Sequence, residues 1–210
     1  MRGRASSHDQ NESRTARHVP ASRNLGRGHG RAGKQPSRGF LYEGGTFTTI
    51  SVPGAPKTWT NGINDSGLIV GSYFDNPSGP AKGFLYAGGA FTTFGVLQGF
   101  FTEARGINGS GQAAGDYGGS GPSSSFMYSG GVSTTFSLPG CGNIQAFGIN
   151  DSGQIAGICD SEGFLYSSGV FTGMSIPDST YTWAHGINDS GQIVGIYSPF
   201  LSPEDLHCRS

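Results

Sequence analysis

A ten-residue phrase recurs four times along the chain, and this internal repeat constrains the fold more than any other feature. GINDSGLIVG begins at Gly62, GINGSGQAAG at Gly106, GINDSGQIAG at Gly148 and GINDSGQIVG at Gly186. Self-similarity at a fixed period is typical of repeat architectures, in which each unit buries its apolar surface against a neighbouring copy. The chain is therefore expected to fold as a stack of similar units.

A second phrase keeps the same register as the first. Gly-Phe-Leu-Tyr begins at Gly39, Gly83 and Gly163, and the variant SFMY begins at Ser125. When each unit is taken from this phrase, four repeats are predicted, at residues 39–82, 83–124, 125–162 and 163–198. Residues 199–210 start a fifth copy and then lose the pattern.

Each repeat is predicted to contain four short strands. The Phe-Leu-Tyr strand is followed by a glycine-rich turn and a run such as FTTISVPG from Phe47, where threonine and aromatic residues suit a half-buried strand. Pro53, Pro139 and Pro177 end this second strand, because proline cannot donate to a continuing ladder. A third strand leads into Gly-Ile-Asn and a fourth returns from it. No segment shows a helical period.

The recurring phrase has the residue types of a hairpin loop. Asn64-Asp65-Ser66-Gly67 places asparagine first in a type I turn and glycine where φ is positive. This predicts a three-residue loop with a glycine bulge. Pairing across the loop is expected to bring Gly62 opposite Gly71. Because neither has a side chain, the sheet of a neighbouring repeat can approach closely there.

Four-stranded units of about 40 to 45 residues are typical of propeller blades. The predicted fold is therefore all-β and β-propeller-like. The alternatives are an open β-solenoid or superhelical stack, or a fragment of a propeller, since four repeats are few for a closed ring. The composition agrees: 38 of the 210 residues are glycine and 11% are aromatic, which fits short strands joined by glycine-rich turns.

The net charge of −1 conceals a basic segment at residues 1–38, which carries nine basic and two acidic side chains. A basic arm suggests nucleic-acid binding. This one has no aromatic residue and no periodicity, so we expect it to be disordered and nucleic acid to be an unlikely partner. No apolar run is long enough for a transmembrane helix. The first 30 residues lack the apolar core of a secretory signal, so we expect none there.

Positions that vary between repeats are the candidate binding positions. One residue before each Gly-Ile-Asn the chain has Asn61, Arg105, Phe147 and His185, and three residues before it Trp59, Glu103, Gln145 and Trp183. Alternation places both positions on one face of the third strand. We predict that this face binds a ligand, with tryptophan stacking on a sugar or peptide. The predicted site residues are Trp59, Asn61, Glu103, Arg105, Trp183 and His185. The alternative is that the two tryptophans fill space between sheets while Glu103 and Arg105 lie in solvent.

No catalytic set, metal site or cofactor is predicted. Glu103 and His185 lie two repeats apart, and nothing in the sequence sets the distance that an acid–base pair requires. Glu103, Asp116 and Glu162 are acidic residues that we expect to be scattered rather than paired. Asp65, Asp151 and Asp189 supply one carboxylate per turn, whereas a calcium loop needs several oxygen ligands.

Two cysteines are candidates for a disulfide. If residues 150–153 form the hairpin turn, Ile144 pairs with Cys159, and Cys141 lies three residues away. A Cys141–Cys159 bridge then requires the loop after Pro139 to fold back; otherwise both thiols are free. A bridge would indicate an oxidising, exported location. Cys208, in the tail, is expected to be free.

The two phrases together resemble the HAF repeats of bacterial extracellular proteins. The resemblance covers residues 39–201 and rests on these segments: Gly39–Pro53, Gly62–Tyr73, Gly83–Phe94, Gly106–Tyr117, Phe126–Pro139, Gly148–Gly157, Gly163–Pro177 and Gly186–Tyr197. It implies a propeller-like fold, an extracellular or cell-surface location, and no established catalytic residues. Residues 1–38 match nothing in these repeats.

The expected function is that of a non-enzymatic extracellular or surface β-repeat scaffold, which binds a carbohydrate or a protein. One alternative is a propeller-type polysaccharide lyase or glycosidase, which requires a suitably spaced pair of carboxylates. The other is that the chain is a truncated fragment of a longer repeat protein. The sequence does not determine the oligomeric state.

Overall fold

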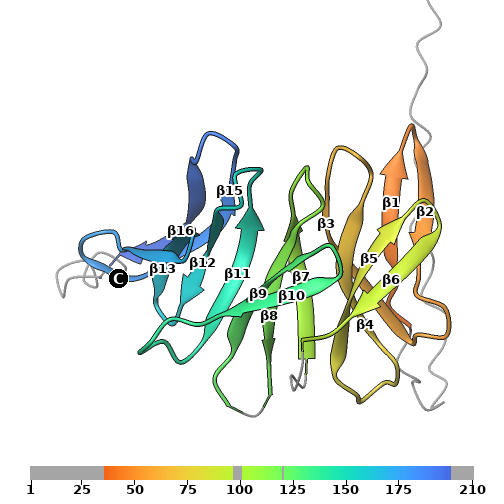
Figure 1. The fold of residues 1–210 in the computed structure, drawn as a ribbon, viewed down its shortest axis with the longest axis horizontal. Helices are drawn as coiled ribbons and strands as arrows, with labels where there is room; N and C mark the ends of the chain where they lie inside the picture. Colours follow the sequence, from red (N-terminus) through yellow and green to blue (C-terminus); the bar gives the residue numbers. More distant parts are fainter. Residues whose placement is uncertain (1–35, 97–100, 120, 200–210) are drawn as a thin grey trace, which may run out of the picture. The chain divides into compact units, whose positions relative to one another are not determined.

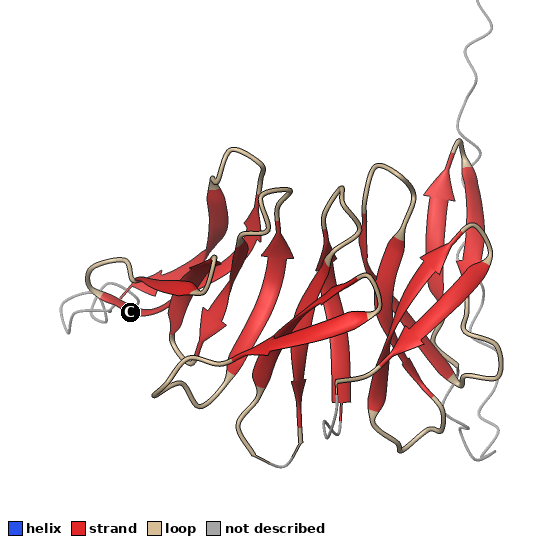
Figure 2. Ribbon diagram, in the orientation of Figure 1, coloured by secondary structure: helices blue, strands red, loops and turns tan. Residues whose placement is uncertain are grey.

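The computed structural model of the chain describes residues 36–96, 101–119 and 121–199. These residues form sixteen strands and no helix, so the all-β prediction is confirmed (Figure 2). No helix in this part of the chain is long and apolar enough to cross a membrane. Residues 1–35 of the predicted basic segment, and the predicted tail from residue 200 with Cys208, lie outside the described residues.

The strands form three complete four-stranded antiparallel sheets and two separate hairpins. The first hairpin is β1 (Gly39–Glu43) and β2 (Thr46–Ile50). The first sheet contains β3 (Lys57–Ile63), β4 (Ile69–Phe74), β5 (Ala81–Ala87) and β6 (Ala90–Phe94). The second contains β7 (Phe101–Ile107), β8 (Ala113–Gly118), β9 (Ser124–Ser129) and β10 (Val132–Phe136). The third contains β11 (Ile144–Ile149), β12 (Ile155–Cys159), β13 (Glu162–Ser167) and β14 (Val170–Met174). The last hairpin is β15 (Ser179–Ile187) and β16 (Ile193–Pro199).

The sheets are out of phase with the repeats of the sequence. Each complete sheet takes its first two strands from the end of one sequence repeat and its last two from the start of the next. The chain crosses between sheets after the second strand of a repeat. There Thr58 Oγ1 accepts a hydrogen bond from the Val52 N–H at 3.1 Å, and Thr102 and Thr182 make the equivalent bond at two later crossings.

The folded part begins slightly earlier than the sequence predicts. The Ser37 carbonyl accepts a hydrogen bond from the Thr58 N–H at 2.9 Å, and Arg38 donates to the Ser51 hydroxyl at 2.6 Å. Ser37, assigned by sequence to the basic segment, therefore contacts the first sheet, and Arg38 contacts the residue that follows β2.

The recurring phrase forms the predicted hairpin loop. The Gly67 N–H donates to the Asn64 carbonyl at 2.9 Å, and Gly67 has a φ of 75°. The predicted pairing of Gly62 with Gly71 is wrong. A β-bulge between Thr60 and Gly62 shifts the register by one residue, so Gly71 faces Thr60 and Gly62 faces Val70.

The first glycine of the phrase nevertheless permits the expected close approach of neighbouring sheets. A Cβ added at Gly106 would lie 2.8 Å from the carbonyl oxygen of Phe147 in the next sheet, and one at Gly62 would lie 2.9 Å from that of Arg105. The second glycine serves its own sheet instead. A Cβ at Gly71 would lie 2.9 Å from the ring of Phe84, which packs over it.

The asparagines of the four turns form a ladder that joins neighbouring sheets, which we call the asparagine ladder: Asn64, Asn108, Asn150 and Asn188. Each amide nitrogen in the first three donates to the carbonyl oxygen of the next asparagine at 2.9 to 3.0 Å. Each amide oxygen accepts the backbone N–H four residues later, which closes its own turn. One side chain thus stabilises both the loop and the stack.

The hydrophobic core lies between successive sheets. The rings of Phe84, Phe126 and Phe164 are fully buried there. Phe136 stacks on Tyr166 of the next sheet with ring centroids 4.4 Å apart. Each sheet contacts the next in chain order (Figure 1). Among the described residues no hydrogen bonds join the first hairpin to the last, so the stack is open, consistent with a solenoid or a propeller fragment.

Candidate functional site

The varied residue before each Gly-Ile-Asn lies near the end of the first strand of a sheet or of the last hairpin. We call these four side chains the variable row: Asn61, Arg105, Phe147 and His185. Asn61 Nδ2 donates to the Ala104 carbonyl at 2.8 Å. The Arg105 guanidinium lies over the Phe147 ring at 5.1 Å, and the Phe147 and His185 rings lie 5.0 Å apart. The structure therefore makes the row continuous across β7, β11 and β15.

Phe147 is a member of the row that the predicted set leaves out. It occupies the same position as Arg105 and His185, but a phenylalanine in a repeat protein is more often a core residue. The row becomes visible only when the four equivalent positions are treated as one set. Its central contacts, cation to ring and ring to ring, both involve Phe147.

Arg105 is held by two carboxylates. Its Nε bonds to Asp116, and its terminal nitrogen lies 2.7 Å from Glu103 Oε2. Glu103 on β7 faces Asp116 on β8 across the ladder. The expectation that these acidic residues are scattered is therefore wrong for this pair, because the bulged hairpin brings them together. Arg105 is three-quarters buried rather than in solvent.

Burial is the main influence on the pKa of Asp116. The side chain is almost fully buried, and this burial raises the pKa of Asp116 even though the hydrogen bond from Arg105 opposes the shift. Burial alone lowers the pKa of Arg105, but the hydrogen bond to Asp116 and the charges of both carboxylates outweigh it, so that pKa lies above its ordinary value. Arg105 consequently stays charged.

The two tryptophans lie in different sheets and do not form one continuous aromatic surface. Trp59 packs edge-on against Phe74 of its own sheet at 5.0 Å, and Trp183 stacks on Tyr181 of the last hairpin at 4.5 Å. The indole N–H of Trp183 is buried and has no hydrogen-bond partner among the described residues. Both aromatic partners belong to the tryptophan's own sheet or hairpin, so these contacts do not place either indole between sheets, and Trp59 is 39% exposed.

Glu103 and His185 take different partners. Glu103 is paired with Arg105, whereas His185 packs on Phe147. The turn carboxylates are also engaged: Asp151 accepts a hydrogen bond from the Gly109 N–H at 2.6 Å, and Asp189 accepts one from the Asp151 N–H at 2.8 Å. These bonds give the turn aspartates a structural role between neighbouring turns.

Cys141 and Cys159 are joined by a disulfide, with their Cα atoms 5.7 Å apart. Ile144 faces Cys159 as the hairpin register predicts. The loop folds back because the Asp160 carboxylate accepts the N–H groups of Gly142 and Asn143, each at 2.9 Å. This crossing has Ile144 where the other crossings have a threonine, so the disulfide and Asp160 stabilise the connection that lacks the threonine bond.

Comparison of the sequence with protein-family models and with curated proteins gives no match.

Proposed function

We propose that the chain is a non-catalytic β-repeat scaffold that binds a carbohydrate or a protein along the variable row. The observation that carries the proposal is the row itself. The Gly-Ile-Asn turns beside it repeat from sheet to sheet and make the same hydrogen bonds, whereas this position holds an amide, a guanidinium, a phenyl ring and an imidazole. In a repeat scaffold, residues that recur hold the stack together, and those that differ are available for recognition.

The chemistry of the row favours a ligand with both apolar and hydrogen-bonding surface. Phe147 offers a partly exposed ring, and the neighbouring exposed His185 adds a second ring with polar edges. Sugars and peptides match such combinations of aromatic and polar groups. The charge of Arg105 is already matched by Glu103 and Asp116, so the row is poorly suited to a phosphate backbone.

The same contacts favour binding over catalysis. A glycosidase needs two carboxyl groups that flank the scissile bond. Glu103 and Asp116 are neighbours, but both bond to Arg105, and Asp116 is buried beneath it. Asp116 therefore cannot touch a substrate in this arrangement. A lyase or glycosidase would need Arg105 to release both carboxylates.

Two observations support a location outside the cell or at its surface. The Cys141–Cys159 disulfide suits an oxidising compartment. The resemblance of residues 39–201 to HAF repeats points the same way. Neither observation depends on the variable row, so location and ligand class are separate parts of the proposal.

The experiment is to screen the full chain against a glycan array and a displayed peptide library, then to measure the affinity of each hit for row variants. Phe147→Ala and His185→Ala are each expected to weaken binding about tenfold, equivalent to about 1.4 kcal/mol. Thr92→Ala on the exposed strand β6 is the matched control and should leave binding unchanged.

Two results would overturn the proposal. Binding that is unaffected by both row variants would place the ligand elsewhere. If the wild-type chain cleaves a polysaccharide and Glu103→Gln does not, the chain is an enzyme and Glu103 takes part in catalysis.

A further inference from the structure

The two hairpins at the ends of the stack are complementary halves of one sheet. A complete sheet consists of a Gly-Ile-Asn hairpin followed by a Phe-Leu-Tyr hairpin, as in β3–β4 and β5–β6. Among residues 36–199, β1–β2 is a Phe-Leu-Tyr hairpin that no Gly-Ile-Asn hairpin precedes in its sheet, and β15–β16 is a Gly-Ile-Asn hairpin that no Phe-Leu-Tyr hairpin follows. The two lie at opposite ends of the row of sheets (Figure 1).

Residues buried in the complete sheets are exposed at these two ends. Phe40 of β1 is 62% exposed, whereas its equivalents Phe84, Phe126 and Phe164 are at most 1% exposed. Val194 of β16 is 69% exposed, whereas Val70, Ala114 and Ala156 at the same position are 0% exposed. Because the sequence pattern is the same, the difference comes from the neighbouring sheet that each end lacks within the described part of the chain, which leaves apolar surface at both ends.

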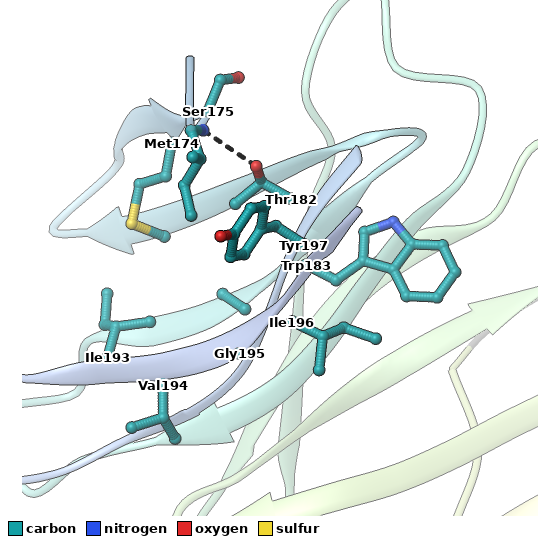
Figure 3. Close-up of a pocket in the computed structure, with 11 residues that line it drawn as sticks. Met174, Ser175, Thr182, Trp183, Ile193, Val194, Gly195, Ile196 and Tyr197 are labelled. Atoms are coloured by element: carbon teal, nitrogen blue, oxygen red, sulfur yellow. Dashed lines mark hydrogen bonds between the residues drawn. The ribbon is translucent and has the colours of Figure 1, made fainter. Parts of the chain in front are cut away.

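The end of the stack at β16 has a hollow at the position where a phenylalanine ring packs in the complete sheets. In the third sheet the ring of Phe164 packs over Gly157, where an added Cβ would lie 2.7 Å from the ring. Gly195 is the equivalent of Gly157, but no ring of the described residues covers it. A hollow of about 240 Å³ opens there between Gly195 and Tyr197 on β16 and Met174 on the preceding sheet (Figure 3). Trp183 points to the opposite side of β16 and does not fill it (Figure 3).

We propose that β1–β2 of a second copy of this chain pairs with the free edge of β16 and completes a four-stranded sheet. The register follows from the complete sheets, where Gly71, Gly115 and Gly157 each face the phenylalanine of the next strand. Gly195 would therefore face Phe40 of the second copy, and Val194 would face Leu41. Addition of a strand to a free sheet edge uses main-chain hydrogen bonds for affinity and alternate side chains for register.

The turns at the two ends are complementary as well. Inside the stack, Asn150 donates to the carbonyl of the next asparagine, and the Asp151 N–H donates to the carboxylate of Asp189. Asn188 and Asp189 have no following turn among the described residues. In the proposed assembly they meet Asn64 and Asp65 of the second copy, which no turn of this type precedes from residue 36 onward. The stacking pattern of the interior would continue across the joint.

The occupant has to supply two strands, Phe-Leu-Tyr and Phe-Thr-Thr. Residues 200–210 contain Phe200 and Leu201, the start of one such strand. Residues 39–50 contain both. The contact joins two different surfaces of the chain, so each added copy leaves a new free end, and the copies form a ring or a longer array.

Sedimentation velocity and light scattering of the full chain, with its disulfide intact, test the proposal. The wild-type mass is expected to rise with concentration to twice the chain mass or more. Phe40→Asp removes one partner surface and Val194→Lys the other, because each would bury a charge in the joint. Each variant alone should be monomeric. An equimolar mixture should form a dimer containing one of each and nothing larger, because only one productive joint remains.

Val170→Lys is the matched control, since Val170 on β14 is 64% exposed and lies outside the proposed joint. This variant should associate like the wild type. Circular dichroism establishes that each variant is folded, which is expected because both substituted side chains are exposed in one copy. A chain ending at residue 199 should also associate like the wild type.

Several outcomes would overturn the proposal: a wild-type chain that stays monomeric at every concentration, association of either variant alone, or a mixture that stays monomeric. Association that appears only after residues 200–210 are removed would show that the tail occupies the edge. The inference does not rest on ligand binding by the variable row, so a negative glycan or peptide screen leaves it unaffected.

Discussion

Asn108 donates its side-chain amide to the carbonyl oxygen of Asn150 at 3.0 Å, and both side chains are almost fully buried at the boundary between two sheets. Asn150 repeats the contact with Asn188 of the last hairpin. The bond explains why asparagine recurs in the first three copies of the phrase: aspartate at the same position would accept the turn bond but could not donate to the next sheet.

Asn150→Ala is expected to lower the free energy of unfolding by about 2–3 kcal/mol, because it removes the turn bond and the bond to the next turn, and leaves the Gln154 N–H and the Asn188 carbonyl of these part-buried bonds without their partner. Asn188→Ala is the matched control. Asn188 makes the same turn bonds with Gln192 but lies exposed at the end of the stack, so about 1 kcal/mol is expected. Urea denaturation followed by circular dichroism measures both. Equal losses would show that the contact between sheets contributes nothing.

Phe164→Ala is expected to cost about 3–5 kcal/mol, since it empties a fully buried site between two sheets. Phe40→Ala, the same substitution at the exposed end, should cost less than about 1 kcal/mol at concentrations where the chain is monomeric. Thermal and urea unfolding of dilute protein give the comparison. Similar costs at the two positions would mean that Phe40 is covered even in a single copy.

The disulfide closes a loop between residues 18 positions apart. Its removal in a Cys141→Ser, Cys159→Ser double variant is expected to cost about 3 kcal/mol. Dithiothreitol should lower the Tm of the wild type and leave that of the double variant unchanged. Denatured, unreduced protein should show one reactive thiol of the three in the sequence. Three reactive thiols before reduction would contradict the bridge.

Asp116 provides a dependence of stability on pH. Burial raises the pKa of Asp116 above its ordinary value of 3.8. At pH values between the pKa of Asp116 in the unfolded chain and its higher pKa in the folded chain, the folded chain holds a proton that the unfolded chain releases. The contribution of Asp116 to the free energy of unfolding therefore falls as the pH rises through this window. The free energy of unfolding of the wild type, relative to Asp116→Asn, should therefore decrease as the pH rises above about 4 and then level off.

Urea denaturation of both chains at a series of pH values measures this difference. The asparagine of Asp116→Asn does not titrate, and all other carboxylates are present in both chains. Their contributions therefore cancel in the difference between the two free energies of unfolding. A difference that grows with rising pH would mean that the hydrogen bond from Arg105 outweighs burial and lowers the pKa in the folded state.

Local features of this fold follow from local sequence. The loop at Asn64–Gly67 is recognisable because its asparagine and its glycine each have one conformational role. The pairing of Ile144 with Cys159 follows from the loop position alone. The pairing of Gly62 with Gly71 does not, because a β-bulge places one extra residue before Gly62, as it does before Gly106, Gly148 and Gly186, and shifts the register by one.

The sequence indicates which strands share a sheet, although the repeat boundaries chosen from the Phe-Leu-Tyr phrase divide each sheet in two. Only Asp160 and Ser161 separate β12 from β13, and Asp160 has a φ of 53°. A link of two residues suits a tight hairpin within one sheet and is too short for a crossing between sheets. The Phe-Leu-Tyr strand therefore belongs to the sheet of the preceding Gly-Ile-Asn hairpin, although both phrases recur with the same period.

Some contacts of the candidate site can be predicted from the sequence of one strand, and others cannot. Alternation along one strand predicts that Glu103 and Arg105 share a face. It does not predict that Asp116 lies beside them or that Phe147 connects Arg105 to His185, since those contacts join different strands and different sheets.

The sequence by itself determined the strands, the loops and the number of repeats, because these depend on residues within a few positions of one another. Only the tertiary structure decided which carboxylates neutralise Arg105, and that Phe40 and Gly195 are exposed at opposite ends of the described stack. The physical reason is that a periodic pattern is the same in every copy, whereas burial depends on whether a neighbour is present.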